Sequence, residues 1–117
     1  MNRSVCLAVF AALFAAPLLC HADPPRNIAL TFDPATKYLK VVMDHPSRDI
    51  QRHYIKQVEV TIAGIPDATI IQQTRTQTGA KGQELIFVLP DARSGARISV
   101  TGTCSITGTR TAVLTTR

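Results

Sequence analysis

Hydrophobic and polar residues alternate with a period of two along most of the chain after residue 26. In residues 28–32, for example, Ile28, Leu30 and Phe32 would share one face of an extended chain. A period of two is typical of half-buried β-strands and not of amphipathic helices. The same alternation recurs in residues 39–43, 58–62, 68–72, 85–89, 98–104 and 111–115. The pattern therefore predicts about seven short strands.

Turn-forming residues separate these alternating runs. They occur at Asp33-Pro34, His45-Pro46-Ser47, Gly64-Ile65-Pro66-Asp67, Thr78-Gly79-Ala80-Lys81-Gly82, Pro90-Asp91, Ser94-Gly95 and Thr107-Gly108. Residues 47–52 are long enough for one helical turn at most, and we expect the polar residues 74–83 to form a mobile hairpin loop. Strands and turns at this spacing predict an all-β fold, an immunoglobulin-like β-sandwich.

The first 22 residues have the pattern of a secretory signal peptide. Arg3 is their one charged residue, residues 5–19 form an uncharged and mostly apolar run, and Asp23 begins a polar stretch with two prolines. The apolar run is shorter than the roughly 20 residues that a membrane span needs. We expect cleavage after Ala22, a single domain over residues 23–117, a periplasmic or secreted location, and no stable membrane span after cleavage.

Removal of this signal changes the available chemistry. The 117 residues with three cysteines become 95 residues with one cysteine, Cys104, and two histidines, His45 and His53. A lone cysteine excludes a disulfide within the chain, although exported compartments are oxidising. The formal charge falls from +5 to +4 with the loss of Arg3. The remaining basic residues are dispersed and tryptophan is absent, so we expect no nucleic-acid partner.

His45, His53 and Cys104 are the residues most suited to carry chemistry. His45 ends one alternating run, His53 precedes the next, and Cys104 ends a later one. Because strand ends that are distant in sequence can meet at one end of a sandwich, these side chains predict a metal site for iron, zinc or copper. Plainer roles exist for each: a turn residue for His45, a strand cap for His53, and a small buried apolar residue for Cys104.

The segment from His45-Pro46 to His53-Tyr54-Ile55 resembles the iron-binding domain of the desulfoferrodoxin and neelaredoxin family, the superoxide reductases. The segment from Cys104 to Gly108 is similar to the part of that family that carries an axial thiolate, and the resemblance covers residues 38–108. It implies a mononuclear iron held by His45, His53 and Cys104, superoxide reduction, and an outside electron donor. Thr107 stands where the family has a further histidine, so the implied ligand set is incomplete.

The same histidine segments are also similar to the small immunoglobulin-like subunit of the sulfur carrier in thiosulfate oxidation. That resemblance implies a metal-free periplasmic binding or carrier module, which docks a protein partner through a sheet edge or through residues 74–83. The sequence is therefore compatible with either a redox enzyme or a binding module.

Overall fold

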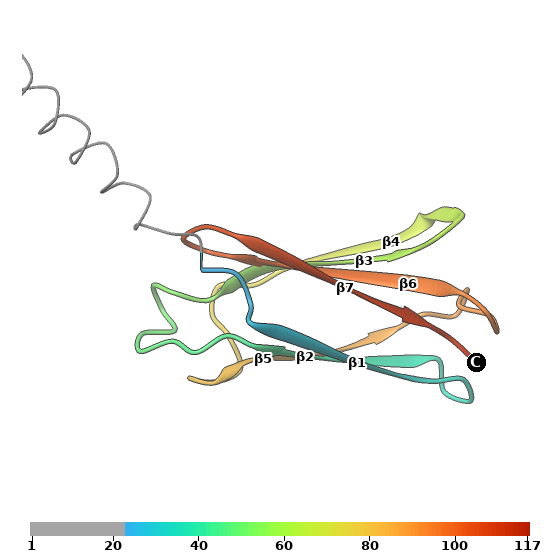
Figure 1. The fold of residues 1–117 in the computed structure, drawn as a ribbon, viewed down its shortest axis with the longest axis horizontal. Helices are drawn as coiled ribbons and strands as arrows, with labels where there is room; N and C mark the ends of the chain where they lie inside the picture. Colours follow the sequence, from blue (N-terminus) through green and yellow to red (C-terminus); the bar gives the residue numbers. More distant parts are fainter. Residues whose placement is uncertain (1–22) are drawn as a thin grey trace, which may run out of the picture.

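The computed structural model describes residues 23–117 and contains seven β-strands (Figure 1). The strands are β1 (Asn27–Asp33), β2 (Tyr38–Asp44), β3 (Ile55–Ile62), β4 (Ile65–Gln73), β5 (Gly82–Val88), β6 (Arg97–Cys104) and β7 (Thr109–Thr115). The expected signal peptide, with Cys6, Cys20 and His21, lies outside the described residues. Within residues 23–117, no helix is long and apolar enough to cross a membrane. The all-β prediction and the number of strands are confirmed.

The strands form two antiparallel sheets. The first has the order β1-β2-β5 and the second has the order β4-β3-β6-β7. Figure 1 shows the two sheets stacked face to face, which makes the fold a β-sandwich of the immunoglobulin-like kind. Each sheet has an inner face that is buried against the other and an outer face that is turned to solvent, as the alternating sequence predicts.

The core lies between the inner faces of the two sheets. Every second residue of β2 and β6 is buried, beginning with Leu39 and Ile98 respectively. The fully buried apolar side chains of the interior include Leu39, Val41, Met43, Ile55, Val58, Val60, Ile98 and Val100. Strict alternation would place Ile55 on the opposite face of β3 from Val58 and Val60. A register irregularity between Ile55 and Gln57 turns Ile55 inward as well.

The register brings three expected site residues to one end of the sandwich. Ile55, the first residue of β3, pairs with Cys104, the last residue of β6, because these two strands are antiparallel. Asp44, the last residue of β2, pairs with Gly82 at the start of β5. This is the end at which the described chain begins in Figure 1.

Two expected connections differ from the structure. Residues 74–83 do not form a hairpin loop, because β4 and β5 lie in different sheets and the connection crosses between them. β5 pairs with β2 instead, which buries Phe87 in the core. The turn predicted at residues 64–67 is shorter in the structure, because β4 begins at Ile65. Ala63 and Gly64 make this turn, and Gly64 has the positive φ of 81° that glycine favours. Pro66 is tolerated because β4 is an edge strand.

Candidate metal site

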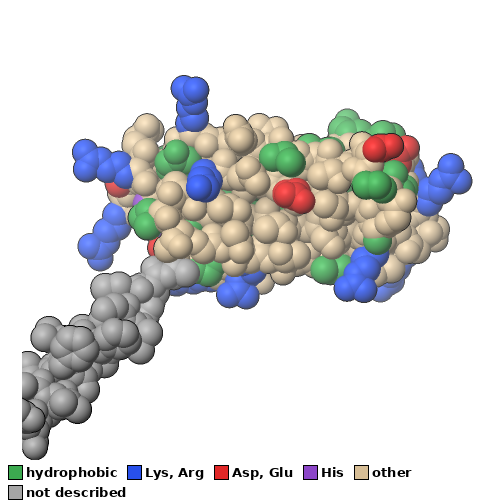
Figure 2. Space-filling view, turned by 90° about the horizontal axis from the view of Figure 1, so that it is seen from above, with side chains coloured by type: hydrophobic (Ala, Val, Ile, Leu, Met, Phe, Trp, Pro, Cys, Tyr) green, Lys and Arg blue, Asp and Glu red, His purple; other side chains and the backbone are tan. Residues whose placement is uncertain are grey.

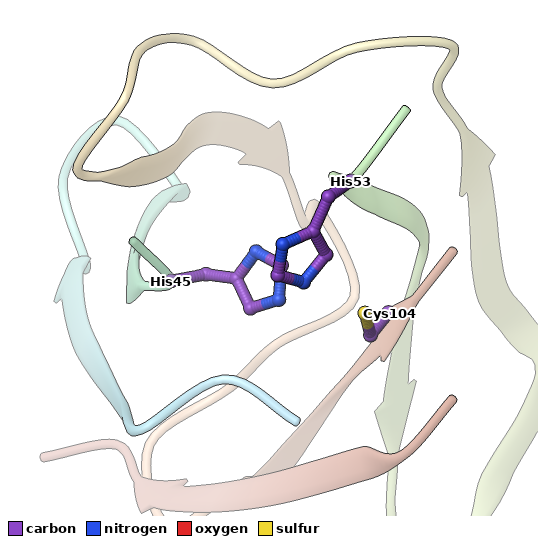
Figure 3. A group of neighbouring side chains, drawn as sticks. All are labelled: His45, His53 and Cys104. Carbon is purple, nitrogen blue, oxygen red and sulfur yellow. The ribbon is translucent and has the colours of Figure 1, made fainter. Parts of the chain in front are cut away.

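The structure brings together the three residues that the sequence analysis selected. His45 directly follows β2, His53 lies two residues before β3, and Cys104 is the last residue of β6. One ring nitrogen of each histidine and the sulfur of Cys104 all lie within 4.8 Å of one another. Figure 3 shows the two imidazole rings beside each other, with the side chain of Cys104 next to them. The predicted convergence of these side chains is thus confirmed.

Two backbone hydrogen bonds hold the segment that contains His45. Its backbone N–H donates to the carbonyl of Lys81 over 2.9 Å, and the N–H of Ser47 donates to the carbonyl of Ala80 over 2.8 Å. The opposing chain is close enough that a side chain at Gly82 would collide with the backbone carbonyl of Met43. The segment after β2 therefore packs against the connection before β5, and only 1% of His45 remains exposed.

Gln77, in the connection between β4 and β5, fixes the orientation of the His45 ring. Its Nε2 donates to the carbonyl oxygens of His45 at 2.8 Å and Gly79 at 3.0 Å. Its Oε1 accepts from the backbone N–H of Ile55 at 3.2 Å and lies 2.9 Å from Nδ1 of His45. Because the amide orientation is set by three backbone partners, Oε1 is the acceptor and Nδ1 of His45 carries the proton.

This assignment leaves Nε2 of neutral His45 with a free lone pair. A ring nitrogen with a lone pair, whose partner nitrogen donates to a fixed oxygen, is the usual state of a metal-binding histidine. The nearest recorded partner of Nε2 is the backbone carbonyl oxygen of Asp23, at 3.1 Å, which is itself an acceptor. Two acceptors therefore face each other unless the ring is doubly protonated or a cation lies between them.

His53 is positioned by the turn that precedes β3. Its carbonyl accepts from Oγ of Ser47 at 2.6 Å, and its N–H donates to the carbonyl of Asp49 at 2.8 Å, which makes the single helical turn that the sequence allows. Its ring meets that of His45 edge to face, with centroids 4.6 Å apart and planes inclined by 74°. The side chain is 20% exposed.

The Nε2 atom of His53 is buried without a hydrogen-bond partner. It lies 2.8 Å from Oδ2 of Asp23, but this oxygen is out of line with the ring N–H direction, so the contact is a close charge approach and not a hydrogen bond. A buried ring nitrogen without a hydrogen-bond partner is uncommon and makes His53 a candidate ligand. Of the buried side-chain nitrogens and oxygens in residues 23–117, this is the one left without a partner.

Cys104 is a free thiol in a closed turn. It is 1% exposed, and its backbone N–H donates to the carbonyl of Gly108 at 2.9 Å. The N–H of Ile106 points to the sulfur, with 3.4 Å between nitrogen and Sγ. A backbone N–H directed at sulfur stabilises a thiolate and is one of the means by which proteins tune metal–thiolate sites. The turn thus presents Cys104 as a ligand as well as a buried residue.

Thr107 does not take the place of a further ligand. It contacts the site through its backbone carbonyl, which accepts from the N–H of Asp23 at 3.0 Å. The donor group consists of His45, His53 and Cys104.

The donor atoms fit a transition-metal ion after a small contraction. Two donors of a tetrahedral ion with bonds to nitrogen and sulfur are separated by roughly 3.3–3.6 Å. The present separations, up to 4.8 Å, require movements of about one ångström or less. Two imidazoles with one thiolate suit zinc, iron or copper, and suit magnesium or calcium poorly. A surface pocket of about 440 Å³ is lined by His53, Arg48 and Asp49 among others, but by neither His45 nor Cys104.

Two residues of the site were missed in the sequence. Gln77 lies in a polar connection with no periodic pattern, and Asp23 lies before the first strand. Both reach His45 across large sequence separations, of 32 and 22 residues. No local signal marks them. The chain has no match among protein-family models, curated proteins or solved structures.

Proposed function

We propose that the protein binds a single transition-metal ion through His45, His53 and Cys104. The observation that carries this proposal is the state of the two rings: Gln77 places the proton of His45 on Nδ1, and Nε2 of His53 is buried without a partner. One ring nitrogen of each histidine lies within 4.8 Å of the Cys104 sulfur. A turn or capping role for the histidines would not require a thiol beside both rings.

Iron is the first candidate for this ion, because the residues that converge are those of the desulfoferrodoxin resemblance. With iron bound, a thiolate ligand supplies electron density that favours one-electron reduction of superoxide to peroxide, with two protons taken from solvent and one electron from an outside donor protein. The chain's own contribution is to hold the ring nitrogens and the thiolate, to exclude water on the Cys104 side, and to leave the pocket beside His53 open to a small anion. Arg48, at the rim of that pocket, would attract such an anion.

Metal content and the visible spectrum of the purified protein test the proposal. We expect one iron or zinc per chain and, for iron, an absorption band from thiolate-to-metal charge transfer. Cys104→Ala should remove the band, and His45→Ala or His53→Ala should lower the metal content. Cys104→Ser serves as the matched control for packing, because it preserves the size of the side chain. A colourless protein that binds no metal after reconstitution with Fe²⁺ or Zn²⁺ would contradict the proposal.

The outer face of the three-stranded sheet supports a second candidate, a metal-free binding module. Tyr38, Val42, Ile86 and Val88 are all exposed apolar residues on β2 and β5. β5 is also an edge strand, so its outer edge could accept an added strand from a partner. This candidate predicts that chelators change neither the melting temperature nor partner binding. By contrast, Ile86→Lys, on the exposed face, would weaken binding.

The basic residues give less support to a nucleic-acid or lipid surface. Figure 2 views the molecule from above Figure 1, and on this face the Lys and Arg side chains project separately, mostly around the ends. The apolar side chains of this face also form small separate groups. Binding to a polyanion uses basic residues gathered in one stripe or patch.

A further inference from the structure

Asp23 covers both histidines of the proposed metal site. Its backbone carbonyl oxygen lies 3.1 Å from Nε2 of His45, and its carboxylate oxygen Oδ2 lies 2.8 Å from Nε2 of His53. Nε2 is the nitrogen of His45 that Gln77 leaves available, and Nε2 of His53 has no hydrogen-bond partner. One residue therefore presents an oxygen to each candidate ligand nitrogen.

The position of Asp23 is determined by a short anchored segment, residues 23–26. The N–H of Asp23 donates to the carbonyl of Thr107 at 3.0 Å, and the N–H of Arg26 donates to the carbonyl of Asp44 at 2.7 Å. Nε of Arg110 donates to the carbonyl of Pro25 at 2.6 Å. Pro25 is fully buried, and two consecutive prolines restrict the backbone of the segment. Asp23 is thus held over the site by three hydrogen bonds and one buried ring.

The oxygens of Asp23 are poor partners for neutral rings when no ion is present, whereas a doubly protonated His45 would donate from Nε2 to the Asp23 carbonyl. The Asp23 carbonyl faces Nε2 of His45, and in the neutral ring the proton is on Nδ1. The Asp23 carboxylate is not aligned with the N–H direction of His53. Oxygen atoms and ring lone pairs directed into the same small space are the arrangement that a cation stabilises. The carboxylate is the stronger ligand of the two oxygens.

Charge balance points to the same role. Counted over the ion and its ligands alone, two neutral imidazoles and one thiolate leave a divalent ion with a net charge of +1. This charge is costly on the buried side formed by His45 and Cys104, whereas the Asp23 side chain is 53% exposed. One carboxylate ligand brings the summed charge of the divalent ion and its ligands to zero. For a monovalent ion such as Cu⁺, the thiolate alone gives neutrality and the carboxylate would add an unbalanced negative charge. Asp23 should therefore favour divalent ions.

We propose that the carboxylate of Asp23 is the fourth ligand of the metal site and that it selects divalent over monovalent ions. This inference rests on the proposed function, because it adds a donor to the same site. The Asp23 carboxylate lies outside the group of donor atoms that are within 4.8 Å of one another, so metal binding would have to draw it from its contact with His53 onto the ion. Binding would also replace the contact between the Asp23 carbonyl and His45. The anchored segment 23–26 then closes the site beside the turn that follows Cys104, where Asp23 is bonded to Thr107.

Titration of the purified protein with Co²⁺ and, separately, with Cu⁺ tests the inference. Co²⁺ reports both the thiolate, through a near-ultraviolet charge-transfer band, and the coordination number, through the intensity of its visible bands. We expect Asp23→Asn to keep the thiolate band, to weaken Co²⁺ binding by about tenfold or more, and to alter the visible bands. Cu⁺ affinity should be equal or higher in this variant, and Asp23→Glu should recover part of the Co²⁺ affinity.

Asp67→Asn is the matched control, because it removes one negative charge from an exposed position near the start of β4, close to the turn at Gly64. It should bind Co²⁺ as the parent protein does. If Asp23→Asn also binds Co²⁺ with unchanged affinity and spectrum while Cys104→Ala loses the thiolate band, the inference is wrong and the proposed metal site stands. If the parent protein binds neither Co²⁺ nor Zn²⁺, the metal site and the fourth ligand are both wrong.

Discussion

Gln77 and His45 form a hydrogen-bonded pair that joins the β4–β5 connection to the end of β2. Oε1 of Gln77 lies 2.9 Å from Nδ1 of His45, and Nε2 of the same amide donates to the carbonyl of His45 at 2.8 Å. The amide therefore holds the ring and the backbone of one residue at the same time. It also binds the N–H of Ile55, which connects it to the first residue of β3.

Gln77→Ala should therefore affect stability and metal binding together. It leaves buried backbone groups of His45 and Ile55 without partners, and we expect a loss of about 1–3 kcal/mol in the free energy of unfolding. Because the His45 ring is no longer fixed, metal affinity should fall by about 10- to 100-fold while the Cys104 charge-transfer band persists. Urea denaturation and metal titration measure the two effects.

Gln72→Ala provides the comparison for Gln77→Ala. Gln72 is an exposed glutamine of β4 whose side-chain amide donates to the neighbouring carbonyl of Gln73. We expect its removal to change the free energy of unfolding by less than about 0.5 kcal/mol. Equal effects of the two substitutions would show that Gln77 has no special role.

Gly102 of β6 lies directly against Met43 of β2. A Cβ atom at this position would be 2.6 Å from Sδ and 2.9 Å from Cε of Met43, and 3.2 Å from the ring of Pro25. Gly102→Ala should therefore overpack the core and lower the free energy of unfolding by about 1–3 kcal/mol. Combination with Met43→Val should be less harmful than the sum of the single changes, because the clash is removed.

Gly79→Ala is a suitable control for this packing test. No atom lies within 4 Å of a Cβ at Gly79, and its φ is not positive. Thermal or urea unfolding should leave this variant close to the parent protein. A Gly102→Ala variant as stable as Gly79→Ala would mean that Met43 moves aside at no cost.

Cys104 should be unreactive in the folded protein. Its 1% exposure prevents a thiol reagent from reaching the sulfur, and it is a free thiol in the structure. We expect no labelling by a maleimide in buffer and one label per mature chain in denaturant. A covalent dimer on a non-reducing gel would instead show that the cysteine pairs with a second chain.

Export should produce a chain that begins at Asp23. The expected cleavage after Ala22 would place a free amino group on Asp23, whose nitrogen lies 3.0 Å from the carbonyl of Thr107 and can still donate to it. N-terminal sequencing of the exported protein should read Asp-Pro-Pro. A chain that retains residue 1, or that begins after Asp23, would contradict this prediction, and in the second case the proposed fourth ligand would be absent.

The strands and the three metal-site candidates could be predicted from the sequence, because they depend on local patterns. Alternation of side chains is a property of consecutive residues, so Leu39 and Ile98 could be assigned to the buried face without knowledge of the partner strands. The histidines and the cysteine could be selected by type, since few other residues of the expected mature chain bind soft metals.

The tertiary structure alone decided which strands pair and what surrounds the candidates. The polar, glycine-containing residues 74–83 predict a hairpin loop, but β5 pairs with β2 and buries Phe87 in the core. Gln77 and Asp23 reach His45 over separations of 32 and 22 residues. A hydrogen bond at such a distance leaves no periodic trace in the sequence, because it depends on how two separately formed segments pack together.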